Sequence, residues 1–305
     1  MKAVQMIRAG GAESLGVVEI PEPEIHDDEV LVLVQAAGVN PVDTKIRAGT
    51  FPRFHPVLPA TLGRDISGTI IRSGSEVSEF RTGEEVFGML DYDRGSYAEL
   101  AAASPREIAR KPFGINHLEA AALPVAALTA WQALFEHGRL RKSQRVLIHG
   151  AGGGVGHYAV QFAAWCGAEV LATCAGSDVD FVGSLGAGRP IDYQSERFEE
   201  IATGMDLVLD LIGGEIRQRS WSTLKSRGIL VSTLPNPKPD GRADVSGREV
   251  VVYSSPAQLD VIGRLVADGR VKVHLDRIFL FTEAQKAHDH LEREHSRGKT
   301  VLRFP

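Results

Sequence analysis

The sequence predicts an α/β protein in which a doubly wound domain with a parallel sheet is set into a β-rich domain. Short strand candidates separated by Gly and Pro fill residues 1–116. Strand and helix candidates then alternate within residues 117–270, which is the pattern of right-handed βαβ units. Residues 271–305 place two strand-like segments around one helix, and we expect this segment to return to the first domain.

The first region holds dense strand candidates, and it ends where the composition changes. Residues 30–34, 68–72 and 85–89 are short apolar runs that we expect to form strands. An alanine-rich segment with helical character begins at residue 117. Pro124 lies inside this segment, and we expect it to break the helix because proline has no backbone N–H to donate.

The second region alternates regularly between the two kinds of element. We expect strands at residues 145–149, 169–173, 206–210, 229–233 and 250–253, and helices at residues 155–166, 178–185 and 256–268. In the last region we expect a helix over residues 282–293 with Thr282 as its N-cap. His288, His290 and His295 follow no zinc-ligand spacing, and we expect them to be exposed.

The composition is that of an ordinary globular protein, with 43% hydrophobic and 24% charged residues among 305. The formal net charge of −5 favours neither nucleic acid nor an anionic membrane as a partner. Cys166 and Cys174 are too few for a disulfide framework, which favours a reducing compartment. The first residues lack the apolar core of a signal peptide, and no apolar run approaches the ~20 residues of a membrane span. We therefore expect a cytoplasmic protein.

A glycine-rich turn follows the strand at residues 145–149 and opens a helix. Small residues let the backbone approach a pyrophosphate, while the helix N-terminus offers free N–H groups and a positive dipole end. Such turns also serve as plain connections, but the surrounding βα alternation favours a dinucleotide-binding, Rossmann-type domain. The residues predicted to bind the cofactor here are Gly150, Gly152, Gly153, Gly154, Val155 and Gly156.

The second strand of this region bears on the choice between NADH and NADPH. An acidic residue at its end would bind the ribose 2′-hydroxyl of NADH. Here the strand runs into residues 173–177, and no carboxylate comes before Asp178. Ser177 can donate a hydrogen bond to a 2′-phosphate, and Arg189 and Tyr193 can add a charge and a hydroxyl, although Arg189 fits a solvated turn nearly as well. The sequence therefore favours NADPH.

Several blocks of the sequence form a recognisable set. They are AGVNPVD (37–43), LGRDISG (62–68), EEVFG (84–88), GSYAE (95–99), AALPVAALTAW (121–131), the glycine turn and RGKTVL (297–302). Together they resemble the medium-chain dehydrogenase/reductase superfamily, in its quinone oxidoreductase and enone reductase branch. The resemblance implies a GroES-like β-barrel domain built from both chain ends, a Rossmann domain between them, and a homodimer. It also implies hydride transfer from NADPH to an α,β-unsaturated carbonyl compound or a quinone.

The resemblance also bears on zinc. Zinc-dependent relatives carry a cysteine ligand in the first block and a His-Glu pair in the second, where this chain has Asn40 and Arg64-Asp65. No cysteine precedes Cys166, so the structural zinc lobe of the alcohol dehydrogenases is missing as well. Without that Lewis acid, reduction of an activated C=C bond or a quinone is favoured over alcohol oxidation.

The resemblance implies roles for four further positions, each with a simpler alternative. Asn40 would lie near the nicotinamide and donate to a carbonyl oxygen as negative charge develops, or it caps the turn before Pro41. Lys45 would stabilise an enolate or relay a proton, or it simply faces solvent. Thr129 would approach the nicotinamide ribose or ring, or it bonds the carbonyl one turn earlier. Leu234 would lie over the nicotinamide carboxamide.

Two alternative functions remain open on the same scaffold. One is one-electron reduction of quinones, and the other is a regulatory protein that binds NADPH without turnover. The pocket for a small-molecule substrate depends on loops that the sequence does not place, although Phe51 offers it an apolar wall. An exposed edge strand at residues 250–253 is the expected dimer contact.

Overall fold

The computed structural model describes residues 1–239 and 241–305, and it divides into two compact units. The first unit combines Met1–Leu128 with Tyr253–Pro305, and the second is Thr129–Val252. Both chain ends therefore build one unit, and the other unit is inserted into it, as the sequence predicts. No helix within the described residues is long and apolar enough to cross a membrane.

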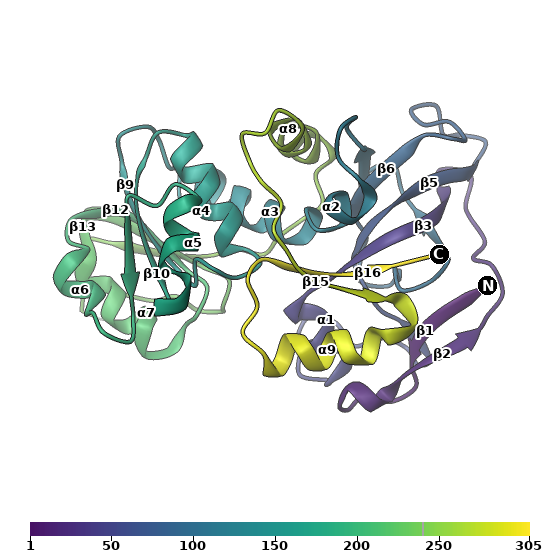
Figure 1. Ribbon diagram of the computed structural model, residues 1–305, viewed down its shortest axis with the longest axis horizontal. Helices are drawn as coiled ribbons and strands as arrows, with labels where there is room; N and C mark the ends of the chain where they lie inside the picture. Colours follow the sequence, from purple (N-terminus) through teal and green to yellow (C-terminus); the bar gives the residue numbers. More distant parts are fainter. Residues whose placement is uncertain (240) are drawn as a thin grey trace. The chain divides into compact units, whose positions relative to one another are not determined.

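The first unit is built on a seven-stranded sheet (Figure 1). Its order is β15-β16-β3-β5-β6-β8, with β7 also paired to β3. Strand β16 runs antiparallel to β3, with Thr300 opposite Val39, so the end of the chain is part of this sheet. The strands are β3 (Val30–Val39), β5 (Asp65–Ser73), β6 (Glu85–Met89), β7 (Leu100–Ala103), β8 (Ile108–Arg110), β15 (Leu275–Leu280) and β16 (Lys299–Arg303).

A second, three-stranded sheet and several helices complete the first unit. The small sheet has the order β2-β1-β4, with β1 at Lys2–Met6, β2 at Leu15–Glu19 and β4 at Ala60–Thr61. The core contains the inward-facing side chains of β3, among them Val30, Val32 and Val34. The helices are α1 (Pro41–Arg47), α2 (His117–Ala121), the start of α3 (Pro124–Trp131), α8 (Pro256–Ala267) and α9 (Ala284–Arg293).

Two expectations about helix ends can be compared with the structure. Pro124 is the first residue of α3, and α2 ends before it, so the expected break is confirmed. The expected N-cap at Thr282 is wrong, because residues Phe281–Glu283 form a short 3-10 turn and α9 begins at Ala284 with Glu283 as its N-cap. The hydroxyl of Thr282 therefore lies in the turn before the helix.

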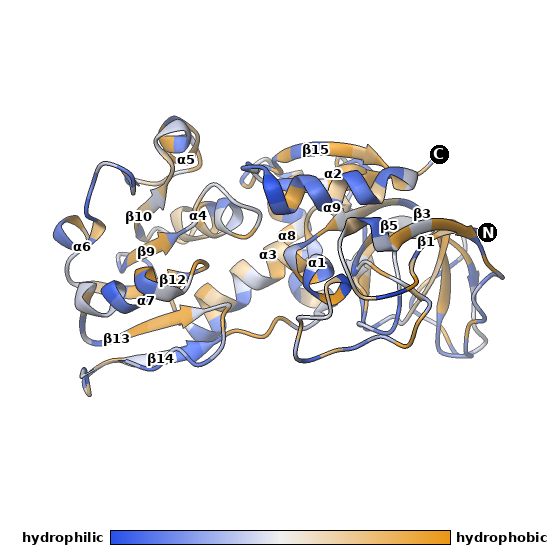
Figure 2. Cartoon of the chain, turned by 90° about the horizontal axis from the view of Figure 1, so that it is seen from below, coloured by the Kyte–Doolittle hydropathy of each residue, from blue (hydrophilic) through white to orange (hydrophobic). Residues whose placement is uncertain are grey.

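The second unit is a six-stranded sheet in which all pairs are parallel. Its order is β11-β10-β9-β12-β13-β14, which is the 3-2-1-4-5-6 order of a doubly wound dinucleotide-binding domain. The apolar central strand has no exposed surface at Val146, Leu147 or Ile148, and Figure 2 shows β13 largely in the colour of hydrophobic residues. The strands are β9 (Arg145–His149), β10 (Glu169–Cys174), β11 (Arg189–Asp192), β12 (Met205–Asp210), β13 (Leu224–Ser232) and β14 (Ser246–Glu249), and the helices are α4 (Gly156–Trp165), α5 (Val179–Ser184), α6 (Phe198–Ile201) and α7 (Gly214–Ser220).

The last strand of this sheet differs from the expectation. The sequence predicts a strand at residues 250–253, but β14 is Ser246–Glu249, paired with β13 from Ile229 to Ser232. The valines and the tyrosine of residues 250–253 have a high strand propensity. A strand also needs a hydrogen-bonded partner, and β13 pairs with residues 246–249 instead. Val251 and Tyr253 are left about half exposed, at 47% and 50%.

Candidate active site

The first unit contains a buried polar cluster at the ends of three neighbouring strands. Asn40 follows β3, Asp65 begins β5 and Lys299 begins β16, and each is at most 2% exposed. Strand register brings them together, because β3 lies between β5 and β16. The chain needs glycine at position 38, since an added Cβ would lie 2.5 Å from the Asp65 carboxylate.

The three side chains are joined by hydrogen bonds. Asn40 Nδ2 donates to Asp65 Oδ2 at 2.8 Å. Lys299 Nζ donates to Asn40 Oδ1, to the Val39 carbonyl at 3.1 Å and to Asp65 Oδ2 at 3.5 Å. The other Asp65 oxygen accepts from the Val125 backbone N–H at 2.7 Å. A buried ion pair and a buried amide therefore form one hydrogen-bonded network.

A second chain of polar contacts starts at the same loop. Asp43, the third residue of α1, accepts from the Asn40 backbone N–H at 2.8 Å and from the Tyr97 hydroxyl at 3.1 Å. The Tyr97 oxygen also lies 3.3 Å from His288 Nε2, and Arg47 Nη1 lies 3.3 Å from His288 Nδ1. Arg47 can only donate, so His288 accepts at Nδ1 and donates from Nε2 to Tyr97.

Burial shifts the titration of these groups. Desolvation raises the pKa of Asp43 to about 7, against the lowering effect of the Asn40 backbone N–H. Desolvation and the neighbouring Arg47 lower the pKa of His288 to about 3, so its ring is neutral. The expectation that His288 and His290 are exposed is therefore wrong: they are 0% and 5% exposed, and only His295 lies at the surface. Figure 2 shows α9 largely in the colour of hydrophilic residues although it buries these two rings.

The remaining residues implied for catalysis lie in different surroundings. Lys45 is on α1 in the first unit, and it is exposed. Thr129 is on α3 at the start of the second unit, and it is 6% exposed. Their roles stay predictions. Three aromatic side chains of the first unit form a further group. The ring centres of Phe51 and Phe54 lie 5.5 and 5.4 Å from that of Tyr92.

The glycine turn of the second unit shows the constraints expected of a phosphate-binding loop. Gly150 has φ = +69°, a conformation that favours glycine. At Gly156 an added Cβ would lie 2.1 Å from the Gly150 carbonyl oxygen, so only glycine lets α4 start this close to the turn. Gly153 is different, because its nearest neighbour would be 3.5 Å away, which leaves space above the loop. The loop thus fits a bound pyrophosphate.

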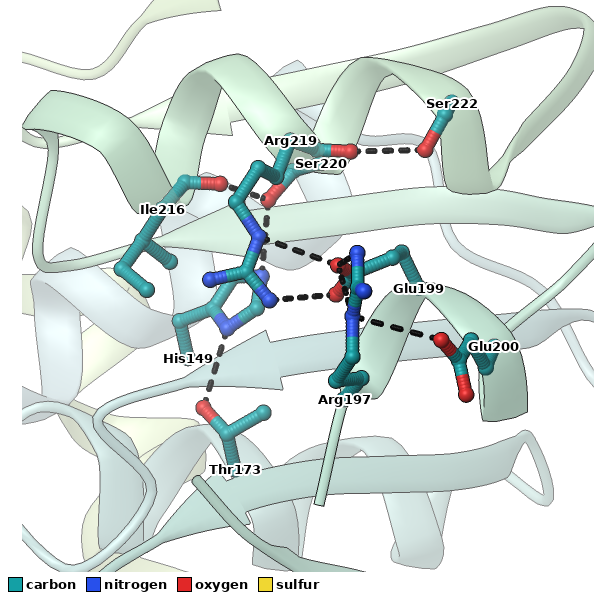
Figure 3. A network of polar contacts seen from close by, with 9 residues as sticks. All are labelled: His149, Thr173, Arg197, Glu199, Glu200, Ile216, Arg219, Ser220 and Ser222. Atoms are coloured by element: carbon teal, nitrogen blue, oxygen red, sulfur yellow. Dashed lines mark hydrogen bonds and ion pairs between the residues drawn. The ribbon is translucent and has the colours of Figure 1, made fainter. Parts of the chain in front are cut away.

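A buried histidine network fixes the strand that leads into this turn (Figure 3). His149, the last residue of β9, lies 2.9 Å from Thr173 Oγ1 and 2.9 Å from Ser220 Oγ. Ser220 donates its own proton to the Ile216 carbonyl at 2.6 Å, so His149 Nε2 must donate to Ser220 and Nδ1 accepts from Thr173. Desolvation lowers the pKa of His149 to about 4, which keeps the ring neutral.

Figure 3 also shows an ion-pair group beside this network. Arg219 on α7 donates to both carboxylate oxygens of Glu199, at 3.2 and 2.5 Å, and Arg197 adds a further contact at 2.9 Å. Burial raises the pKa of Glu199, but the hydrogen bonds from Arg219 and Arg197 outweigh it and hold the pKa at about 2. Helices α6 and α7 are therefore tied together beneath the sheet edge.

The other predicted cofactor residues lie at the carboxyl ends of neighbouring strands. Ser177 follows β10 and is exposed, Tyr193 follows β11 and is 54% exposed, and Leu234 follows β13 and packs over Gly213. This edge is where doubly wound sheets bind their ligands. A cavity of about 460 Å³ is lined in part by Tyr193 and by Arg219 of α7.

The structure also brings two carboxylates to this edge, which the order of residues did not suggest. An added Cβ on Gly152 would lie 2.8 Å from Asp178, and one on Gly176 would lie 2.8 Å from Asp192. Desolvation first, and then these two carboxylates, raise the pKa of Cys174 to about 11. The surroundings of Ser177 are therefore more acidic than residues 173–177 alone indicate.

The side chains at the positions of zinc ligands do not fit a zinc ion. Arg64 donates from Nε to the Leu90 carbonyl at 2.9 Å, and its guanidinium lies 3.9 Å from the centre of the Tyr92 ring. Asn40 and Asp65 are engaged with Lys299. Among residues 1–239 and 241–305, no three His, Cys, Asp or Glu side chains form a group that could hold a metal ion.

A doubly wound unit with a glycine turn, inserted into a β-rich unit with a buried amide, defines a two-domain nicotinamide-dependent oxidoreductase. Comparison with known proteins agrees. Residues 26–113 match the alcohol dehydrogenase GroES-like domain, and residues 185–302 match the zinc-binding dehydrogenase family.

Individual relatives and structures match over nearly the whole chain. The chain is 32% identical to the mitochondrial NAD(P)H oxidoreductase RTN4IP1 of Danio rerio, over 92% of this chain and 85% of that protein. It is 33% identical to the 2-methylene-furan-3-one reductase of Solanum lycopersicum, over 92% and 73%. The quinone oxidoreductase structure from Coxiella burnetii aligns with a TM-score of 0.92 and 34% identity, over 99% of both chains. The chain belongs to the medium-chain dehydrogenase/reductase superfamily, in its quinone oxidoreductase and enone reductase branch.

Sequence reasoning missed part of the first-unit cluster. Asp65 and Lys299 lie in the blocks LGRDISG and RGKTVL, but nothing in these blocks indicates that the two side chains pair. Asp43 accepts a hydrogen bond from the Asn40 backbone N–H, which fixes the loop between them. The link from Asp43 through Tyr97 to His288 was not expected. Ala284, Ala287 and His288 are spaced three and four residues apart, and from this spacing the buried face of the helix could have been predicted.

Proposed function

We propose that this chain reduces α,β-unsaturated carbonyl compounds or quinones with NADPH and without a metal ion. One observation carries the proposal: the buried amide of Asn40 is oriented by a donor-only cation and an acceptor-only carboxylate. Its Nδ2 has two N–H groups, and Asp65 takes one of them among the described residues. The other is available to the carbonyl oxygen of a substrate.

When bound, the reduced nicotinamide supplies the hydride. The backbone of Gly150–Gly156 would hold the pyrophosphate, while Thr129 and Leu234 would contact the nicotinamide end. Asn40 donates its free N–H to the acceptor oxygen as negative charge develops there, which is the oxyanion role. Hydride addition at the β-carbon leaves an enolate, and Lys45 or water donates a proton to its α-carbon. A quinone takes up one hydride and one proton to give the hydroquinone.

Two features support planar acceptors and NADPH. Phe51, Phe54 and Tyr92 form an aromatic group on which a flat enone or quinone ring can pack. Ser177 and Tyr193 offer exposed hydroxyls for a 2′-phosphate, and the cavity beside Tyr193 is where we place the adenosine end of the cofactor.

The test is a steady-state assay that follows loss of the reduced nicotinamide. Purified protein is given a panel of quinones and α,β-unsaturated ketones, with NADPH and with NADH in parallel. We expect turnover of at least one class and a higher kcat/KM with NADPH. NADPH binding without turnover on the whole panel would overturn the reductase proposal and favour a regulatory protein. Equal or better turnover with NADH would overturn the cofactor choice alone.

Variants of Asn40 test the mechanism itself. Asn40→Ala removes the donor, and we expect kcat to fall about 10²-fold, with little change in the KM for NADPH. Ser14→Ala is the matched control, because Ser14 is buried in the same unit outside this network. A two-electron reaction yields hydroquinone without a detectable semiquinone radical. A radical signal that grows with turnover would instead establish one-electron reduction.

The oligomeric state and location also belong to the proposal. We propose a homodimer that pairs through β14, because it is the edge strand of the six-stranded sheet. Sedimentation of the wild type and of Glu249→Pro, which removes one donor from that strand, tests it. We also propose a cytoplasmic location, which imaging of a tagged chain in its host would check.

A further inference from the structure

We propose that Lys299 is a positioning residue for Asn40: its ammonium group sets which end of the amide faces the substrate. The inference rests on the proposed function, in which Asn40 donates a hydrogen bond to the substrate oxygen. Lys299 lies 259 residues away in the sequence, on the first position of β16, and it is 2% exposed.

The contacts allow only one orientation of the amide. An ammonium group has three N–H donors and no acceptor, and a carboxylate has only acceptors. Lys299 donates to Asn40 Oδ1, and Asp65 Oδ2 accepts from Asn40 Nδ2 at 2.8 Å. Turning the amide over would place its NH₂ against the ammonium and its oxygen against the carboxylate, so both contacts would become repulsive.

Lys299 acts through Asn40 and does not touch the substrate itself. Its three donors are all used, by Asn40 Oδ1, by the Val39 carbonyl at 3.1 Å and by Asp65 at 3.5 Å. Its side chain is only 3% exposed. The amide is polarised by the adjacent positive charge, which strengthens the remaining N–H as a donor.

The ammonium group of Lys299 also lies beside the positions that correspond to the zinc site of zinc-dependent relatives. Asn40 and Asp65 occupy the positions at which zinc-dependent relatives carry ligands, and here a lysine ammonium contacts both. A zinc ion polarises the substrate oxygen directly, whereas this cation polarises it through the amide of Asn40. The last strand of the chain thereby supplies part of the electrostatics of the proposed site.

Removal of Lys299 alone is a poor test, because it leaves the Asp65 carboxylate buried without its cation and the chain can fail to fold. Two variants avoid this problem. Lys299→Arg keeps a donor-only cation. The double variant Asp65→Asn with Lys299→Met removes both charges together. In the double variant the Val125 N–H holds the carbonyl of the new amide, so its NH₂ faces Asn40 and turns the Asn40 amide over.

The experiment compares thermal unfolding with kcat and the KM for NADPH. We expect both variants to unfold cooperatively and to bind NADPH with unchanged KM. Lys299→Arg should keep kcat within about threefold, whereas the double variant should lose about 10- to 100-fold in kcat. Equal kcat in the two folded variants would overturn the inference. If Lys299→Arg unfolds, the wild type takes its place in this comparison.

A double-mutant cycle separates positioning from a general structural role. The double variant Asp65→Asn with Lys299→Met is combined with Asn40→Ala, and kcat is measured below the unfolding temperature on protein that binds NADPH. If Lys299 acts through Asn40, this pair of substitutions should lower kcat at least about tenfold in the wild type and less than about twofold beside Asn40→Ala. Equal losses in both backgrounds would overturn the inference. A wild-type kcat for Asn40→Ala alone would instead overturn the proposed role of Asn40.

Discussion

The pKa of Asp43 predicts an unusual pH dependence of stability in the first unit. Burial raises this pKa from 3.8 to about 7 in the folded chain, partly opposed by the Asn40 N–H. Asp43 Oδ1 has no hydrogen-bond partner among the described residues, so no donor at this oxygen stabilises the ionised form. Between about pH 4 and 7, Asp43 in the folded chain therefore keeps a proton that it has lost in the unfolded chain. Stability from this group is present at low pH and is lost as the pH rises through about 7.

The size of the effect follows from the shift. A shift of about three pKa units, at about 1.4 kcal/mol for each unit, changes the free energy of unfolding by at most about 4 kcal/mol. Roughly 2 kcal/mol of this stability is lost between about pH 5 and 7. Asp43→Asn has no titrating group at this position. We therefore expect the wild type to lose roughly 2 kcal/mol relative to Asp43→Asn over that interval.

The assay must report on the correct unit. All three tryptophans, Trp131, Trp165 and Trp221, lie in the second unit, so fluorescence does not follow the unit of Asp43. Amide hydrogen exchange of β3 reports local and global opening there. The control is Asp206→Asn. Burial tends to raise the pKa of Asp206, but the Arg145 N–H and Lys225 lower it overall, so its stabilisation is lost only as the pH falls below about 4.

The wild type and Asp43→Asn should differ in how the stability of β3 changes with pH. Between about pH 5 and 7 the exchange free energy of β3 should diverge between the wild type and Asp43→Asn, and it should stay parallel for the control. Parallel curves for all three proteins would mean that Asp43 is already ionised in the folded chain at the lower pH.

Three further predictions concern the second unit. Gly156→Ala places a Cβ 2.1 Å from the Gly150 carbonyl and should weaken NADPH binding at least about tenfold by nucleotide fluorescence, whereas Gly183→Ala, which has space and lies outside the turn, should not. Asp192→Asn removes a carboxylate near Ser177 and should lower the KM for NADPH about threefold, while the KM for NADH stays unchanged. An unchanged ratio of the two KM values would contradict the placement of the 2′-phosphate. His149→Phe breaks two buried hydrogen bonds and should cost about 1–3 kcal/mol in urea unfolding followed by tryptophan fluorescence, and no loss would show that Thr173 and Ser220 find other partners.

The elements of the fold could be predicted where a local pattern determines them. The parallel sheet of the second unit follows from apolar strands alternating with helices, and the glycine turn is marked by residues that a Cβ would exclude. The edge strand could not be placed in the same way. Its residues are Ser246–Glu249, which are polar, and they become a strand only because β13 offers free ladder groups beside them.

Buried polar residues are the hardest feature to read from the sequence. His288 and His149 look like surface residues by type, since a histidine is buried at a cost unless both ring nitrogens find partners. Those partners are Tyr97 and Arg47 in one case, and Thr173 and Ser220 in the other, and they come from distant segments. Only the three-dimensional structure shows that both ring nitrogens of each histidine have partners.

The Asn40 site shows why partners at long sequence separation decide function here. Asn40 could be selected from its block alone, but an isolated asparagine can present either its oxygen or its NH₂ to a ligand. The choice depends on Asp65, 25 residues away, and on Lys299, 259 residues away. Lys299 reaches it only because β16 pairs with β3 in the register that sets Thr300 opposite Val39. A shift of one residue in this register would turn Lys299 to the other face of the sheet and leave the Asp65 charge unpaired. The register of the last strand therefore determines the orientation of the Asn40 amide in the first loop.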